Sequence, residues 1–193
     1  ATPLLDAMRT EVTCGQFLDV FAQAEPVGGV DLMSLVPQVV EFKTSRYTVI
    51  RPLQVGAALA GASEPALAAL AAYGSPLGRA FQFRDDVLGV FGEPEVTGKP
   101  AGDDLREGKR TVLLAHALAG LDAGGQARVE SLVGRADLDA SQVEELRATI
   151  VGSGAVARLE DAATSALGDA TSIGDEARAA LLDLVGITTA RTA

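Results

Sequence analysis

The sequence predicts an all-α protein. Alanine and leucine dominate the composition, aromatic residues contribute only 4%, and no long stretch of β-branched residues alternates with polar ones as in a half-buried strand. Between residues 67 and 89, apolar residues instead recur at steps of three and four, which is the period of one helix face. The 193 residues contain no internal repeat or low-complexity linker, so we expect a single helical domain spanning residues 1–193.

Proline, glycine and capping residues divide the chain into a series of helices. Thr2 begins the first, which we expect to continue to about Ala24, before a break at 25–29. Ser63 likewise caps a long central helix over about 65–91. The other expected helices are 31–45, 48–60, 110–119, 125–132, 140–151, 155–167 and 175–185.

Charge and hydropathy exclude several classes of function. A net charge of −10 argues against nucleic acid or an anionic membrane as the main partner. No apolar run approaches the ~20 residues that a membrane span needs, and no charged-then-apolar leader begins the chain. The one cysteine, Cys14, rules out an internal disulfide framework and favours a cytoplasmic location. We interpret it as a small core residue.

Two adjacent carboxylates lie in the long central helix. Phe81, Asp85 and Leu88 follow the helical period, so we expect Asp85 on the inward, apolar side and Asp86 about 100° round the axis. A carboxylate pair facing a core is costly unless a cation meets it. Magnesium, held by one or two carboxylates and completed by phosphate oxygens and water, is such a cation. The alternative is a solvated pair on the helix surface.

A glycine-rich, basic stretch follows at 96–111. Lys99 and Lys109 are separated by glycines that permit close approach of the backbone to a phosphate, although the pattern is not a Walker loop. Carboxylates on a helix, followed by such a loop, suit a magnesium-bridged diphosphate. Taken alone, the stretch is a weak signal, because most such charged runs are surface loops.

Three weaker signals precede the central helix. Gly15 lies inside the first helix, where glycine costs ~1 kcal/mol relative to alanine, so close approach of another helix is expected there. Gln16 and Asp19, one turn apart, would satisfy each other if buried. Lys43, before Thr44, is most simply explained as a charge in the last turn of a helix.

His116, which follows the central helix, lies among apolar residues, and this favours a core or rim histidine over a metal ligand.

Read together, these pieces resemble the later part of a trans-isoprenyl diphosphate synthase, the all-helical family of farnesyl and geranylgeranyl diphosphate synthases. The resemblance covers about residues 8–115. The motifs that carry it are, in order, Gly15-Gln16…Asp19, Lys43-Thr44…Tyr47, Gly78…Phe81-Gln82…Asp85-Asp86 and Gly98-Lys99…Gly102…Asp104…Gly108-Lys109…Thr111.

The resemblance implies a helical bundle of the isoprenoid synthase type and a prenyltransferase that condenses an allylic diphosphate with isopentenyl diphosphate. It further implies a homodimer and magnesium as cofactor. By resemblance, each site residue has a role: Asp85 and Asp86 bind magnesium; Lys43, Lys99 and Lys109 bind the diphosphate; Thr44 and Gln82 line the carbocation side; Phe81 flanks the homoallylic substrate; Gln16 and Asp19 face the prenyl channel or support the metal site.

Two departures from the family pattern matter. The second aspartate-rich motif often ends in a third aspartate, whose position is Gly89 here, so we expect metal binding to survive with its outer support either weakened or supplied by Asp103 or Asp104. The first aspartate-rich motif is absent from residues 1–193, so we expect a chain truncated at the N-terminus that is inactive alone. The alternatives are a non-catalytic helical partner subunit of a polyprenyl synthase, a terpene cyclase and a helical binding module.

Overall fold

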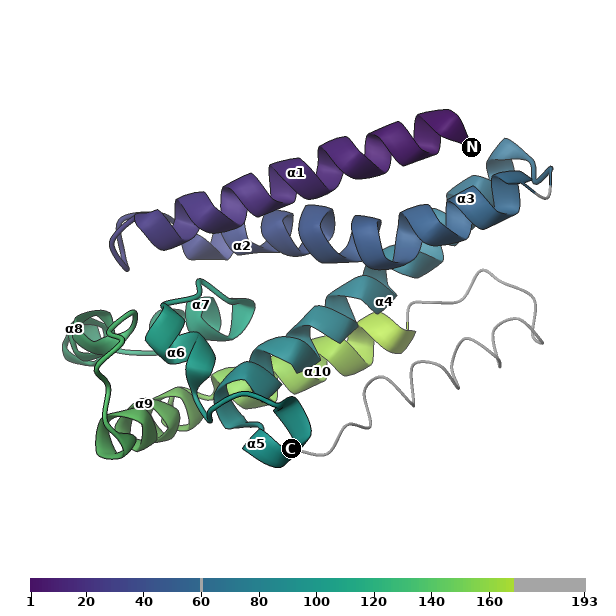
Figure 1. The fold of residues 1–193 in the computed structure, drawn as a ribbon. Coiled ribbons are helices and arrows are strands. Elements are labelled where there is room, and N and C mark those ends of the chain that lie inside the picture. Colours follow the sequence, from purple (N-terminus) through teal and green to yellow (C-terminus); the bar gives the residue numbers. More distant parts are fainter. Residues whose placement is uncertain (60, 169–193) are drawn as a thin grey trace. The chain divides into compact units, whose positions relative to one another are not determined.

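The computed structural model describes residues 1–59 and 61–168, and within these ranges every regular element is a helix (Figure 1). The all-α fold is therefore confirmed for the described residues, and the helix expected at 175–185 lies outside them. The elements are α1 (Thr2–Ala24), α2 (Leu32–Val39), the π-helix η1 (Val40–Ile50), α3 (Arg51–Leu59), α4 (Glu64–Phe91), α5 (Pro94–Thr97), α6 (Asp103–Glu107), α7 (Val112–Ala119), α8 (Ala123–Leu132), α9 (Ala140–Gly152) and α10 (Ala155–Gly168).

The described residues form two compact units. Unit 1 contains residues 1–18, the stretch between 38 and 82, and 162–168, whereas unit 2 contains 19–37 and 83–161. Each unit has its own buried apolar residues: Val40, Ile50 and Tyr73 belong to unit 1, and Leu113 and Ile150 belong to unit 2. The units are therefore described separately below.

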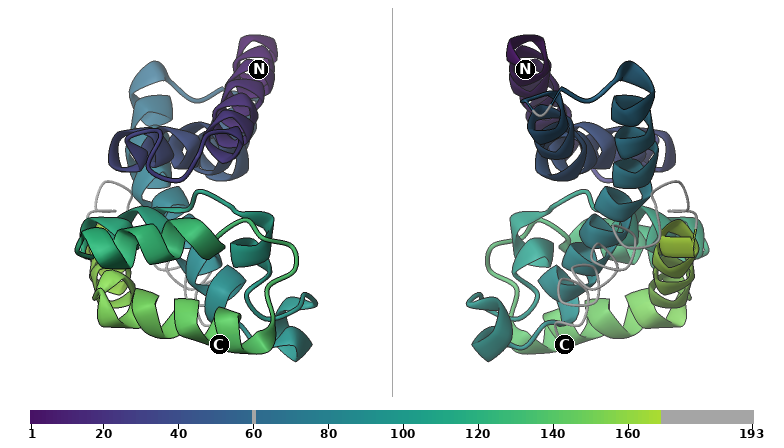
Figure 2. Two further views of the ribbon diagram at one scale, coloured as in Figure 1. Left: turned by 90° about the vertical axis from the view of Figure 1, so that its left-hand side faces the viewer. Right: turned by 90° about the vertical axis from the view of Figure 1, so that its right-hand side faces the viewer.

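In unit 1, the first part of α1 lies beside η1 and α3, as the views of Figure 2 show. Glycine makes this packing close. A Cβ atom on Gly15 of α1 would lie 2.5 Å from the backbone nitrogen of Lys43 in η1, and one on Gly78 of α4 would lie 2.7 Å from the Cβ of Ser45. The expected close approach at Gly15 is therefore confirmed, and η1 packs against a second glycine as well.

The break expected between helices 31–45 and 48–60 is wrong, because helical structure continues from α2 through η1 into α3. The chain passes this region as a π-helix: the backbone N–H of Arg51 donates to the carbonyl of Arg46, five residues earlier. Pro52, which donates no backbone hydrogen bond, falls in the first turn of α3. Because a π-helix has more residues per turn than an α-helix, its apolar residues do not recur with the 3.6-residue period by which helices are predicted from sequence.

The buried side of α4 differs from the one expected. Tyr73, Ala80 and Val87 are buried at seven-residue steps, and Asp86, next to Val87, is only 3% exposed. Asp85 is exposed. The expected inward position of Asp85 is therefore wrong. The buried face of α4 includes Asp86 and Val87, whereas Leu88 and Gly89, which were expected on the same face as Asp85, are only half-buried.

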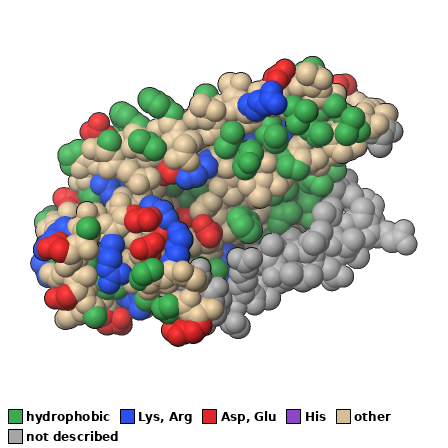
Figure 3. Space-filling model, in the orientation of Figure 1, with side chains coloured by type: hydrophobic (Ala, Val, Ile, Leu, Met, Phe, Trp, Pro, Cys, Tyr) green, Lys and Arg blue, Asp and Glu red, His purple; other side chains and the backbone are tan. Residues whose placement is uncertain are grey.

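In unit 2, helices α7, α8 and α9 lie close together (Figure 2). The α7 side chains Leu113 and Ala117 are fully buried, and the Thr111 hydroxyl caps the helix by accepting from the N–H of Leu114. Acidic and basic side chains lie close together on the part of this unit's surface seen in Figure 3. Arg128 of α8 and Glu145 of α9 form an exposed ion pair of 2.6 Å.

Two further expectations meet the structure. Cys14 is exposed, so its assignment to the core is wrong. Within residues 1–59 and 61–168, no helix is both long enough and apolar enough to cross a membrane.

The glycine contact in unit 1 gives a testable prediction. Changing Gly78 to Ala should lower the free energy of unfolding by about 1–3 kcal/mol, since the new methyl group overlaps Ser45 and the backbones must separate. Gly56→Ala is the matched control: nothing lies within 4 Å of its Cβ position, so it should be neutral or stabilising by up to ~1 kcal/mol. Urea unfolding measures both, and a Gly78→Ala protein as stable as the control would contradict the packing.

Candidate functional site

In unit 1 the structure brings together two residues that lie 38 positions apart. The Thr44 hydroxyl in η1 donates a hydrogen bond of 2.6 Å to Oε1 of Gln82 in α4. Thr44 is buried and Gln82 half-buried. Because the acceptor is a side-chain amide oxygen, this bond fixes the orientation of the Gln82 side chain. Phe81, the preceding residue, is half-buried.

Lys43 is half-buried and immediately precedes Thr44 in η1. Its backbone nitrogen and Cα face Gly15, where any side chain would collide with them. The sequence produces this arrangement because only glycine lets the two helices approach so closely. Gln16, the next residue of α1, is exposed.

In unit 2, the buried carboxylate of Asp86 has a structural partner. Its Oδ2 accepts a hydrogen bond of 2.9 Å from the backbone N–H of Val112, the first residue of α7. A carboxylate is favourable at a helix N-terminus because backbone N–H groups there lack partners within the helix. Asp86 thereby connects α4 to α7, which the sequence alone did not indicate. Exposed Asp85 remains accessible to solvent.

Gly89 marks a second contact within unit 2. A Cβ atom on Gly89 would lie 2.5 Å from the carboxyl carbon of Asp104, so the Asp104 carboxylate occupies the space that a side chain at position 89 would need. Asp104 is buried, whereas Asp103 is half-buried. Of the two acids expected to compensate for the glycine, Asp104 is the one beside it.

Asp104 also pairs with Lys109, and Glu107 lies 3.1 Å from the same amine. Partial burial disfavours the charged amine, but the hydrogen bonds and negative charges of Asp104 and Glu107 together outweigh it and raise the pKa of Lys109 above its ordinary value. Lys109 is therefore a firmly protonated cation, held by two carboxylates at the end of α6.

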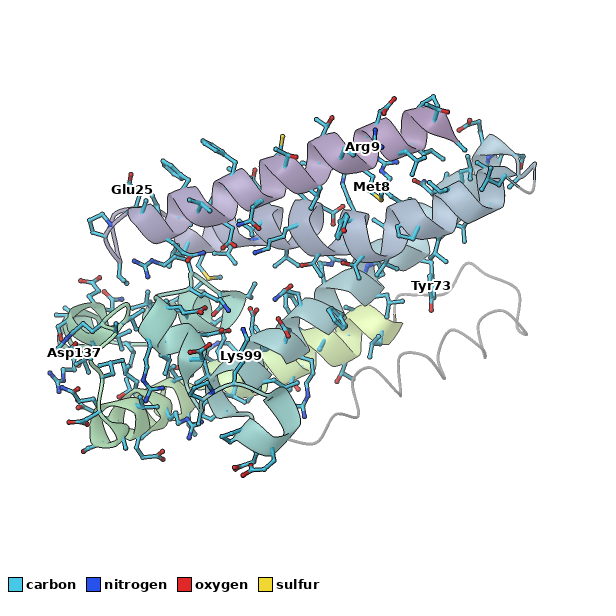
Figure 4. The ribbon with its side chains drawn as sticks, in the orientation of Figure 1. Met8, Arg9, Glu25, Tyr73, Lys99 and Asp137 are labelled. Carbon is cyan, nitrogen blue, oxygen red and sulfur yellow. The ribbon has the colours of Figure 1, made fainter. Side chains whose placement is uncertain are left out.

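The glycine-rich stretch is more ordered than a loop, because it contains the short helices α5 and α6. Gly98 and Gly108 follow these helices and Gly102 precedes α6, all three with φ of 70–73°, where L side chains are disfavoured. The glycines are thus required by the turns themselves. Lys99 lies on the exposed connection between α5 and α6 (Figure 4).

Two other predicted residues have local partners. Asp19 Oδ1 accepts a hydrogen bond of 2.9 Å from Gln23, one turn later in α1. His116 is half-buried, and burial together with the nearby charge of Arg158 lowers its pKa, as fits a rim histidine. Among the described residues, no group of three or more His, Cys, Asp and Glu side chains is placed to hold a metal ion.

The predicted site residues thus fall into two groups. Unit 1 holds Gln16, Lys43, Thr44, Phe81 and Gln82, of which the structure joins Thr44 to Gln82. Unit 2 holds Asp19, Asp85, Asp86, Lys99 and Lys109.

Sequence reasoning missed an ionic group in unit 1. Arg46 of η1 and Arg51 of α3 both bind Glu11 of α1, and Arg46 also binds Glu41. The spacing of Glu41 and Arg46, five residues apart, is not an α-helical pair spacing and gave no signal.

Comparison with known proteins identifies relatives. The family model described as polyprenyl synthetase matches residues 1–150. Geranylfarnesyl diphosphate synthase of Aeropyrum pernix is 33% identical over 158 residues, which are 81% of this chain and 46% of that protein. A (2E,6E)-farnesyl diphosphate synthase of Mycobacterium tuberculosis is 41% identical over 95 residues, 49% of this chain and 26% of that protein.

A solved structure has the same fold. The crystal structure of a geranylgeranyl pyrophosphate synthase from Corynebacterium glutamicum, complexed with isoprenyl diphosphate and magnesium, matches with a TM-score of 0.89 and 38% identity over 98% of this chain. The match covers 55% of that chain, so the present chain spans about half the length of the solved relative and less than half of the two curated ones. On the family match over residues 1–150 and this agreement in fold, the chain belongs to the polyprenyl synthetase family.

Proposed function

We propose that this chain provides diphosphate-binding and cation-stabilising residues for a prenyl transfer in isoprenoid biosynthesis. One observation carries the proposal: Thr44, from the second motif of the resemblance, donates its hydroxyl to Gln82, from the third. A hydroxyl and an amide oxygen held together in this way, one residue from Lys43, combine a cation for the diphosphate with polar groups for a neighbouring carbocation.

The reaction has three parts. The carbon–oxygen bond of the allylic diphosphate breaks, and inorganic diphosphate leaves with the electron pair. The double bond of isopentenyl diphosphate then attacks the allylic carbon, and the resulting cation loses a proton to the released diphosphate as the new double bond forms. In the proposal Lys43, Lys99 and Lys109 take the negative charge of the diphosphate, and Thr44 and Gln82 face the cation. Phe81 flanks the homoallylic substrate, and Gln16 and Asp19 support the prenyl channel.

Asp85 and Asp86 are the residues that would hold magnesium. Carboxylate oxygens are the ligands that magnesium prefers, and two of them leave the remaining positions for water and diphosphate. Asp85 fits this role because it is exposed, while Asp86 is oriented by its bond to Val112. When bound, magnesium would neutralise charge on the departing diphosphate. The solved relative is itself complexed with magnesium and isoprenyl diphosphate.

The proposal extends to assembly and location. Val20 and Phe21, near the end of α1, are 56% and 41% exposed, which is unusual for large apolar side chains side by side on a helix. The family resemblance implies a homodimer, and we propose that these two residues belong to its interface. A single cysteine among 193 residues is consistent with the cytoplasm as the compartment.

The proposed magnesium site is tested by measuring the binding of magnesium pyrophosphate with titration calorimetry. We expect Asp85→Asn to weaken magnesium-dependent binding at least about tenfold, since one carboxylate ligand is lost, a change of ~1.4 kcal/mol in binding free energy. Asp161→Asn removes another exposed helical carboxylate of unit 2 and should leave the affinity unchanged. Equal affinities of the two variants would refute the assignment of Asp85.

The same protein tests whether the chain is a complete catalyst. With an allylic diphosphate, isopentenyl diphosphate and magnesium, we expect no elongated product, because the sequence lacks the first aspartate-rich motif of the family. Robust product would overturn the expected inactivity. Binding of magnesium pyrophosphate without turnover would fit both an incomplete catalytic site and a non-catalytic partner subunit. Adding a complete synthase distinguishes these alternatives, because only a partner subunit should change the rate of that synthase.

Assembly is tested by sedimentation. The wild-type chain should sediment as a dimer, and replacing Val20 and Phe21 together by Ser should shift it toward the monomer, because apolar area is lost from the interface. Val151→Ser, at an equally exposed valine in α9, is the control and should leave the dimer intact. A monomeric wild-type chain would exclude the proposed dimer.

A further inference from the structure

The carboxylate of Glu11 in α1 receives two arginines. Arg51 donates from Nε to Oε2 over 2.7 Å and from Nη2 to Oε1 over 2.5 Å, and Arg46 donates from Nη1 to Oε1 over 2.7 Å. The Glu11 side chain is only 13% exposed. A two-pronged arginine–carboxylate pair in partial burial is stronger and more directional than a surface ion pair.

This group continues into the other helices of unit 1. Arg46 Nε donates to Glu41 over 3.0 Å, and the other oxygen of Glu41 accepts from the Ser75 hydroxyl in α4. Arg51 donates to Gln54, whose amide donates to the backbone carbonyl of residue 67. We name Glu11, Glu41, Arg46 and Arg51 the Glu11 network. It connects α1, η1 and α3 and reaches α4 through Ser75, and Glu41 and Arg46 lie on either side of Lys43 and Thr44 along the chain.

The network fits the π-helical turn and not an α-helical one. In an α-helix residues 41 and 46 would lie about 140° apart round the axis, too far for a direct pair of side chains. In a helix closed by bonds between residues five apart they lie on nearly the same side, and the Arg51 N–H bond to the Arg46 carbonyl has this spacing. The ion pair between Glu41 and Arg46 therefore selects the wider turn.

The wider turn sets what Lys43 and Thr44 face. Thr44 meets Gln82, Lys43 lies against Gly15, and Ser45 lies against Gly78. If the segment returned to α-helical winding, each residue after 41 would rotate relative to α1 and α4, and the Thr44 bond to Gln82 would break.

We propose that Glu11 is a positioning residue: through Arg46 and Arg51 it holds η1 in the π-helical turn that presents Lys43 and Thr44 for diphosphate binding and cation stabilisation. The role of those two residues rests on the proposed function, whereas the control of the turn by Glu11 is independent of it. Nothing in the sequence motifs includes Glu11, which lies one helical turn before Gly15.

The charge of Glu11 can be followed by pH. The hydrogen bond from Arg51 lowers the pKa of Glu11, with Arg46 acting in the same direction and partial burial opposing both. A lowered pKa in the folded state means that the carboxylate stabilises the fold above its unfolded pKa of 4.5 and that this contribution is lost as the pH falls through the folded value. The stability difference between wild type and Glu11→Gln should therefore be constant above about pH 5 and shrink below it.

The decisive test compares Glu11→Gln, which keeps the side-chain volume and removes the charge, with Glu145→Gln, which breaks the exposed pair with Arg128. Amide hydrogen exchange should accelerate at least tenfold at residues 42–51 in Glu11→Gln and stay unchanged in α9. The Thr44 methyl resonance should shift in Glu11→Gln alone, since it reports the bond to Gln82. Glu145→Gln should change neither. Affinity for magnesium pyrophosphate should fall about tenfold in Glu11→Gln.

Three outcomes decide the matter. Exchange that accelerates equally in all helices, with the Thr44 resonance unmoved, would show a general stabilising role and overturn the proposal. Unchanged pyrophosphate affinity in Glu11→Gln, beside a wild type that binds, would also overturn it. A wild type that does not bind pyrophosphate defeats the proposed function, while the exchange and resonance data still decide whether Glu11 sets the turn.

If Glu11→Gln does not fold, Arg46→Lys replaces it. This variant keeps the positive charge but loses the planar guanidinium, and it should show the same local effects.

Discussion

The contact of η1 with two glycines is the constraint on which unit 1 depends. Gly15 and Gly78 admit the backbones of Lys43 and Ser45 at distances that any side chain would prevent. With the segment held on both sides, a rotation of its turns would drive side chains into α1 or α4. The Thr44 bond to Gln82 follows from this packing, because the hydroxyl and the amide are brought within 2.6 Å by backbones that cannot separate cheaply.

In both units, hydrogen bonds and ion pairs of polar side chains restrict how the helices can be oriented. In unit 1, Glu11 binds two arginines and so relates the winding of η1 to α1. In unit 2, the buried Asp86 accepts from the first N–H of α7, and Asp104 holds Lys109 beside Gly89. A buried carboxylate is costly without a partner, so each of these pairs admits few alternative arrangements. Residues adjacent to them along the chain thereby receive fixed backbone positions.

The sequence predicted the helices well where caps and apolar periodicity agree, as at Thr2–Ala24 and along α4. It failed where the helix departs from 3.6 residues per turn, because the π-helical stretch has no matching apolar period and was taken for a break. It also misjudged Asp85 by one residue, since alanines and glycines carry too little apolar weight to fix the phase of a helix face. The close helix contact at Gly15 was predictable, because a glycine inside a helix costs stability unless another helix approaches closely there. The Glu11 network was not, because its partners lie 35 and 40 residues away.

The most direct test of the account is a nuclear magnetic resonance titration of the isotope-labelled chain with magnesium pyrophosphate. The account predicts that the backbone amides of Lys43 and Thr44 in unit 1, and of Asp85 and Lys99 in unit 2, shift in a saturable, magnesium-dependent manner. It also predicts that amides of α8 and α9 stay in place. Shifts confined to α8 and α9, or no saturable shift at all, would contradict the claim that these residues bind a diphosphate.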